Sequence, residues 1–330
     1  MQEKDVIVVT LNYRVGVFGF LASDDASVDA NAGILDQRMA LEWIKRNIHA
    51  FGGDKERITV FGMSAGATSI AVHLTSPTTP PGLFKRAIHQ SGPLGIRMRR
   101  MEDTIHASMD VARRLKCIRY VQKGISAQDE EVMDMQCMRT RKSKEILKAL
   151  KDPMNNQTAH FQHPDPKHRQ ALDNNVAHEM GDMFYWWPTL DGKHIVDQPY
   201  ESLKQGKLAI PNIDLIMGVQ RDEGGYYTVD YDSPVIGTWK SNKIHNSTSH
   251  TKHVQQLFGQ DYFRLAQYYP EHPDTEGNLL EIANLVGDFV FICPTQSAAD
   301  GLSHSSAVKR LWMYEWTQPG FVSLSFQFVP

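Results

Sequence analysis

A serine lies at the centre of the segment with the clearest chemical signature in this sequence. Residues 57–68 read Arg-Ile-Thr-Val-Phe-Gly-Met-Ser-Ala-Gly-Ala-Thr, an apolar run that leads into a Gly-x-Ser-x-Gly motif and then into small residues. A strand, this motif and a helix in succession form a sharp turn that holds a serine Oγ clear of a sheet. The turn needs almost no side chain two residues before and after the serine, and Gly62 and Gly66 meet that need. The segment therefore predicts Ser64 as a nucleophile.

The same turn predicts a site for the negative charge that develops during the attack. It places Ser64 at a helix N-terminus, where backbone N–H groups and the positive end of the helix dipole stabilise an oxyanion. The N–H of Ala65 is the donor expected from this segment.

Strands and helices alternate around the turn. Residues 5–14 are rich in β-branched side chains and apolar on both faces, which predicts a strand buried inside a sheet. A helix is expected from residue 36 to Gly52 and Gly53, because apolar residues recur three or four apart, at Leu41, Ile44, Ile48 and Phe51. The next strand and helix are predicted at residues 57–62 and 65–74. This alternation favours a largely parallel sheet.

The rest of the chain adds elements but no domain boundary. Three more short apolar strands are predicted, at residues 86–89, 214–219 and 310–316. Helices are predicted at residues 103–115, 142–150, 253–269 and 276–293, and an exposed loop at residues 152–175. We interpret residues 1–330 as one domain.

Further blocks extend the signature around Ser64 over almost the whole chain. They are Leu-Asn-Tyr-Arg-Val-Gly-Val-Phe-Gly-Phe-Leu at residues 11–21, Asn-Ala-Gly-Ile-Leu-Asp-Gln-Arg-Met-Ala-Leu-Glu-Trp-Ile at 31–44, Phe-Gly-Gly at 51–53, Leu-Phe-Lys-Arg-Ala-Ile-His-Gln-Ser-Gly at 83–92 and Pro-Thr-Leu-Asp-Gly at 188–192. Together they resemble the type-B carboxylesterase and cholinesterase family. The resemblance implies an α/β-hydrolase fold with a mostly parallel sheet flanked by helices, here incomplete at both termini. It also implies hydrolysis of small-molecule carboxylic esters without a metal or an organic cofactor.

The resemblance implies Glu223 as the acid of a catalytic triad. It lies in Gly-Val-Gln-Arg-Asp-Glu-Gly-Gly, after a predicted strand and after the serine in chain order. Its role would be to orient a histidine and to stabilise the imidazolium form. In the family that histidine follows a strand like the one predicted at residues 310–316, but no histidine follows His304 here. We therefore expect the base to lie outside this chain, and we interpret His89 as structural.

A second part of the family's machinery is expected to lie upstream of Met1. This is a Gly-Gly-rich loop that supplies two of the three oxyanion donors, and Gly52 and Gly53 cannot replace it because they end a helix. Losing even one donor costs about 10²- to 10³-fold in rate. The chain as given is therefore predicted to be inactive.

The cysteines and two sequons indicate a secreted or ER-lumenal parent. Cys117 and Cys137 fall where secreted relatives close a disulfide loop, so we expect them to be bonded. Cys293 resembles a cysteine that pairs near the C-terminus in cholinesterase-like members; alternatively it is a small buried hydrophobe. Asn156 and Asn246 begin glycosylation sequons. The N-terminus itself has no signal-peptide pattern.

Three residues bear on substrate choice. Phe184 aligns best with an acyl-pocket aromatic, although it could equally pack in the core. Ser91 resembles a buried serine that supports the site, or it is a plain strand-end residue. Met63 stands where the family most often has Glu, which weakens the case for a choline ester because no carboxylate would hold the cation.

Composition excludes several other classes of function. Hydrophobic residues make up 41% and charged residues 22%, as in a globular protein. A net charge of −3 argues against nucleic-acid binding, and no apolar run is long enough to cross a membrane. The cysteine spacing fits no zinc site. The oligomeric state is not fixed by the sequence.

Two rival interpretations remain. The first is a non-catalytic, cholinesterase-like binding or adhesion protein, which the retained Ser64 and Glu223 disfavour. The second is an inert fragment of the esterase.

Overall fold

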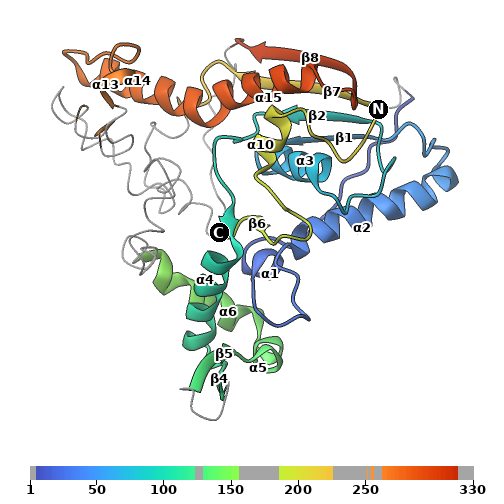
Figure 1. The fold of residues 1–330 in the computed structure, drawn as a ribbon, viewed down its shortest axis with the longest axis vertical. Coiled ribbons are helices and arrows are strands. Elements are labelled where there is room, and N and C mark those ends of the chain that lie inside the picture. The colour runs from blue at the N-terminus through green and yellow to red at the C-terminus, as the bar shows by residue number, and fades with distance from the viewer. Residues whose placement is uncertain are drawn as a thin grey trace.

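A parallel β-sheet lies in the upper part of the molecule as drawn in Figure 1. The computed structural model describes residues 5–122, 129–155, 186–225, 251, 254–255 and 262–318. Within them the four-stranded sheet has the order β1 (Thr59–Met63), β2 (Arg86–Gln90), β7 (Ile213–Gln220) and β8 (Val308–Trp316). All three neighbouring pairs are parallel, which confirms the predicted arrangement. The carboxyl ends of the four strands therefore share one edge.

Helices cover one face of this sheet. Ala87 of β2 and its register partner Leu215 of β7 are buried on that face. They belong to one hydrophobic cluster with residues of four helices: α2 (Ala32–Asn47), α3 (Ala65–Thr75), α10 (Pro199–Lys204) and α15 (Cys293–Ser303). The predicted apolar positions Leu41, Ile44 and Ile48 are buried in this cluster, whereas Phe51 is exposed. The helix ends earlier than its apolar spacing indicates, because residues 48–51 form the short 3-10 helix η1 (Ile48–Phe51).

The other helical elements surround this core. They are α1 (Val17–Phe20), α13 (Tyr262–Leu265) and α14 (Thr275–Gly287), with the π-helix η4 (Asp288–Ile292) joining α14 to α15. A close contact fixes α14 against the sheet: a Cβ on Gly224 would lie 1.7 Å from the carbonyl oxygen of Ala283. The loop after β7 therefore requires glycine at this position.

The strand predicted at residues 5–14 is wrong. The segment pairs with no described strand, and the side chains of Val6, Ile7, Val8 and Val9 are exposed. β-branched residues favour an extended backbone, but a strand also needs a neighbour for its N–H and C=O groups. Here Ile7 packs against Gly53 instead.

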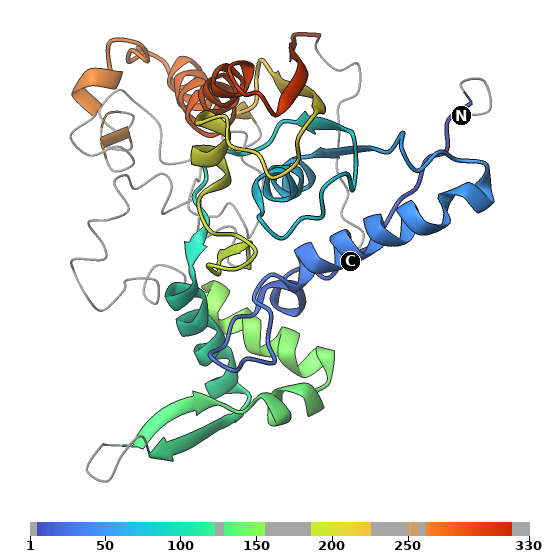
Figure 2. The same cartoon turned by 45° about the vertical axis from the view of Figure 1, so that its right-hand side comes forward.

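A second group of elements projects away from the sheet (Figure 2). It contains α4 (Met101–Arg114), the antiparallel pair β4 (Ile118–Gln122) and β5 (Asp129–Met133), α5 (Met135–Thr140) and α6 (Ser143–Asn155). These elements share a separate hydrophobic cluster, which includes Val111 and Met138. A short parallel pair, β3 (Arg99–Arg100) with β6 (Thr189–Leu190), lies at its base. Helices α4 and α6 were predicted, but α5 and the β4–β5 pair were not.

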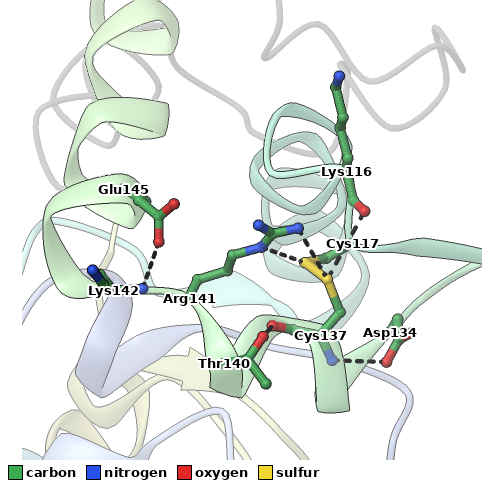
Figure 3. Close-up of a disulfide and its surroundings, with 8 residues drawn as sticks. All are labelled: Lys116, Cys117, Asp134, Cys137, Thr140, Arg141, Lys142 and Glu145. Carbon is green, nitrogen blue, oxygen red and sulfur yellow. Dashed lines mark hydrogen bonds between the residues drawn. A yellow bond between two sulfur atoms is a disulfide. The ribbon is translucent and has the colours of Figure 1, made fainter.

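A disulfide closes this second group, as predicted (Figure 3). Cys117, just after α4, is bonded to Cys137 in α5, with 5.3 Å between their Cα atoms. The Arg141 guanidinium donates to both sulfur atoms, at 3.2 and 3.4 Å. Cys293 is exposed and has no disulfide partner in the described part of the chain. The alternative that Cys293 is a buried hydrophobe is therefore wrong, because the residue is exposed at the start of α15.

Candidate active site

Ser64 occupies a strained turn between β1 and α3. Its backbone angles are φ 53° and ψ −115°, outside the regions that a residue with a side chain prefers. Two hydrogen bonds hold it there: its N–H donates to the Gln90 carbonyl of β2 at 3.0 Å, and its own carbonyl accepts from the Thr68 N–H at 2.9 Å. The side chain is half-buried, and no described residue makes a hydrogen bond to Oγ. Among the described residues, only the backbone turn directs the hydroxyl.

The two glycines of the motif play different parts in this turn. A Cβ on Gly62 would lie 2.6 to 2.9 Å from the backbone of Gly66, closer than real side chains come. A Cβ on Gly66 would meet nothing within 4 Å. The steric demand therefore belongs to Gly62, whose backbone lies against the start of α3.

Ala65 is the first residue of α3 and is exposed. Its N–H lies at the helix N-terminus, where the first N–H groups have no intrahelical acceptor and the dipole favours negative charge. The Ser64 side chain does not cap the helix. This end of α3 can therefore receive an oxyanion formed beside Ser64.

Glu223 lies after β7, at the same sheet edge as Ser64, with β2 between their strands. Its Oε1 accepts from the Gln220 N–H at 2.8 Å, which folds the half-buried side chain back over the strand end. No histidine of the described part hydrogen-bonds to this carboxylate. The structure thus brings the predicted nucleophile and acid to one edge, without a described base between them.

Ser91 lies between these two positions, at the end of β2. It also has a positive φ, 48°, and its N–H donates to the Gly218 carbonyl of β7 at 2.8 Å. Its side chain is buried. Ser91 therefore links the end of β2 to β7, the strand that precedes Glu223.

His89 is a buried component of the sheet. It is 2% exposed, and burial lowers its pKa to about 4. Neither ring nitrogen has a hydrogen-bond partner among the described residues, and a Cβ on Gly92 would lie 2.1 Å from the ring. The neutral, enclosed imidazole fills space beneath the Gln-Ser-Gly segment. This environment is consistent with the interpretation of His89 as a structural residue.

Sequence reasoning missed a buried polar link between two of the sequence blocks. Asn31 donates to the Thr189 carbonyl at 2.8 Å and to the Asp191 carboxylate at 2.9 Å. Burial alone would raise the pKa of Asp191, but bonds from the N–H groups of residues 193–195 and from Asn31 hold it below its ordinary value. The sequence singled out both blocks, but it did not show that Asn31 would contact Thr189 and Asp191.

Other predicted residues are exposed or lie outside the described residues. Phe184, Asn156 and Asn246 belong to the latter group. Met63 is exposed, directly before the nucleophile. In the described ranges, no three His, Cys, Asp or Glu side chains gather as metal ligands do, and no helix is long and apolar enough to span a membrane.

A strained serine at a strand-to-helix turn of a parallel sheet, with a carboxylate after a later strand, defines the class of α/β hydrolases. Comparison with known proteins narrows the class, since the model of the carboxylesterase family matches residues 1–325. The chain belongs to the carboxylesterase family.

Several curated relatives match most of the chain. An acetylcholinesterase of Myxine glutinosa is 34% identical over 90% of this chain and 80% of its own length. Cholinesterase 1 of Branchiostoma lanceolatum is 31% identical over 96% of this chain and 82% of its own. The para-nitrobenzyl esterase of Bacillus subtilis (strain 168) is 31% identical over 95% of this chain, which spans 53% of that enzyme. Family and relatives support carboxylic ester hydrolysis and do not favour the non-catalytic alternative.

Proposed function

We propose that this protein hydrolyses carboxylic esters through an acyl-enzyme on Ser64. The observation that carries the proposal is the backbone of Ser64, held at φ 53° between β1 and α3 with Gly62 against the helix start. Strain of this kind costs of order 1–3 kcal/mol and persists where it serves a site.

Each group at the sheet edge has a role in this proposal. The Ser64 Oγ attacks the ester carbonyl and loses its proton to an imidazole, while the Ala65 N–H stabilises the oxyanion. The imidazole then protonates the leaving alcohol. Water, deprotonated by the same imidazole, next attacks the acyl-enzyme, which releases the acid and restores the Ser64 hydroxyl. Glu223 orients the imidazole and stabilises its charged form.

The base is the missing part of this proposal. No histidine follows His304, and no described histidine contacts Glu223. We therefore propose that the 330-residue chain by itself reacts slowly, because no described residue supplies the base.

The finer parts of the proposal concern substrate, domain and compartment. We propose small carboxylic esters without a requirement for choline, since Met63 offers no charge to a cation. Residues 1–330 would form part of one domain. The Cys117–Cys137 disulfide supports folding in an oxidising compartment, as in secreted proteins.

A fluorophosphonate probe tests the proposal, with imidazole added as an external base. We expect slow labelling of the chain, mapped to Ser64 by mass spectrometry, at least tenfold faster with imidazole and absent in Ser64→Ala. Absence of label on Ser64 under both conditions would overturn the nucleophile assignment. Fast labelling without imidazole would instead overturn the claim that the chain lacks its base.

A further inference from the structure

A continuous chain of buried hydrogen bonds connects helix α2 to the residue that follows the nucleophile. Ala65, Ser69 and His73 are spaced four apart along α3 and so lie on one stripe of the helix. The Ser69 Oγ contacts the Ala65 carbonyl at 2.9 Å. Gln37 of α2 faces this stripe, with its Nε2 3.0 Å from the Ser69 Oγ and its Oε1 3.0 Å from the His73 Nε2.

The chemistry of the groups fixes the direction of every bond in this chain. A carbonyl only accepts, so Ser69 donates to Ala65. The Ser69 oxygen then accepts from the Gln37 amide nitrogen, which turns the amide oxygen toward His73. His73 must donate from Nε2, and burial lowers its pKa to about 3, so the ring is the neutral tautomer with its proton on that nitrogen.

Burial keeps this chain of hydrogen bonds away from solvent. Gln37 and Ser69 are 6% and 8% exposed, and His73 is 3% exposed, so bulk water cannot replace a lost bond. The next residue of α2, Arg38, donates to Ser76, Thr78 and Thr79 in the loop that follows α3. Two adjacent residues of α2 therefore hold α3, Gln37 through Ser69 and His73 within the helix and Arg38 through the loop that follows it.

We propose that Gln37 and Ser69 are positioning residues for the Ser64 turn, acting through the Ala65 carbonyl. This inference rests on the proposed role of Ser64 as nucleophile. The bond from Ser69 fixes the peptide plane after Ala65, and with it the first turn of α3 from which the Ala65 N–H points. The Gln37 amide holds the Ser69 hydroxyl in that direction, and His73 holds the amide.

Amide hydrogen exchange at Thr68 tests the inference without requiring catalysis, because that N–H donates to the Ser64 carbonyl. We expect exchange at Thr68 to be at least tenfold faster in Ser69→Ala and in Gln37→Leu. Ser69→Thr should restore the original rate, since a threonine hydroxyl can make the same bond to the carbonyl four residues back. If Gln37→Leu does not fold, Gln37→Glu keeps the acceptor for His73 while removing the donor to Ser69.

Thr75→Val is the matched control. Thr75 makes the same kind of bond in the same helix, from its Oγ1 to the Ala71 carbonyl at 2.9 Å, but at the far end from Ser64. This variant should leave exchange at Thr68 unchanged, even if it lowers the unfolding midpoint as much as Ser69→Ala does. Equal effects of the two variants at Thr68, or no effect of Ser69→Ala, would overturn the inference.

Labelling of Ser64 by the fluorophosphonate in the presence of imidazole provides the second measurement. The rate should fall at least tenfold in Ser69→Ala and recover in Ser69→Thr; an unchanged rate in Ser69→Ala would overturn the inference. If the parent chain takes no label at Ser64, the proposed function fails, and the exchange measurement still decides whether Gln37 and Ser69 hold the turn.

Discussion

Ser64 and Ser91 both have positive φ, and they end neighbouring strands of the sheet. Their N–H groups donate across the strand ends, Ser64 to Gln90 and Ser91 to Gly218, so each strained residue is held by the next strand. Strained conformations persist only where the surroundings over-determine them. The row of strand ends from β1 to β7 is therefore locked as a unit, and Glu223 follows directly after it.

The two glycines beside Ser64 give a prediction with a built-in control. Gly62→Ala should destabilise the fold by about 1–3 kcal/mol, because the added methyl meets backbone atoms of Gly66 that cannot move aside. Gly66→Ala places its methyl in open space within α3, where alanine is favoured over glycine by roughly 0.5–1 kcal/mol. Chemical denaturation of both variants measures the contrast. Equal loss of stability in the two would show that the turn is packed differently.

His89 predicts an acid-sensitive fold. Its pKa is about 4 in the native state because of burial, against 6.5 in the unfolded chain, so the unfolded state binds the extra proton between these values. The free energy of unfolding should therefore fall as pH drops from about 6.5 to about 4, by up to roughly 3 kcal/mol from this residue. His73, with its pKa lowered to about 3, acts in the same direction.

Denaturation across this pH range, compared with a His89→Gln variant, tests the assignment. In the variant the free energy of unfolding should depend less steeply on pH, whatever its value at neutral pH. His49→Gln, a change at an exposed position of η1, is the control. A slope that is the same in His89→Gln and in the unmodified chain would rule out His89 as its source.

At the scale of elements, periodicity and turn residues predicted the four strands of the parallel sheet and the helices α2, α3 and α4. They failed where the pairing of one strand with another, rather than the local preference of the residues, determines the secondary structure. Residues 5–14 have strand-like side chains but no ladder, and β5 begins with three acidic residues that do not resemble a strand. At the candidate site, Gly-x-Ser-x-Gly between a predicted strand and a predicted helix indicated Ser64. The Gln37–Ser69 contact could not be predicted, because it depends on how two helices face each other.

The disulfide stabilises the elements that project from the sheet. Cys117 and Cys137 are 20 residues apart in sequence, and closing a loop of that length stabilises a fold by about 3 kcal/mol in the chain-entropy model. We expect Cys117→Ala/Cys137→Ala to speed proteolysis within β4 and β5 while the protection of β2 and β7 against hydrogen exchange is retained. Loss of protection in both regions would show that the two parts unfold together.

At the scale of the molecule, one face of the parallel sheet has little cover among the described residues. Phe61, Ile88, Ile216 and Trp312 are register partners across all four strands and form one row on that face. Phe61 is 61% exposed and Trp312 48%. Parallel sheets are normally covered on both faces, and exposed apolar surface of this kind marks a contact or an aggregation site.

This row predicts that the chain self-associates. The outer edge of β1 adds to the tendency, because no described strand pairs with it and edge strands are templates for further pairing. Phe61→Lys should raise the protein concentration at which light scattering first detects oligomers, with little change in the unfolding midpoint, since the side chain is already exposed. Phe263→Lys makes the same change at a 76% exposed position on α13, away from the sheet, and should leave that concentration unaltered. If the two lysines shift the concentration equally, added charge rather than the sheet face controls association.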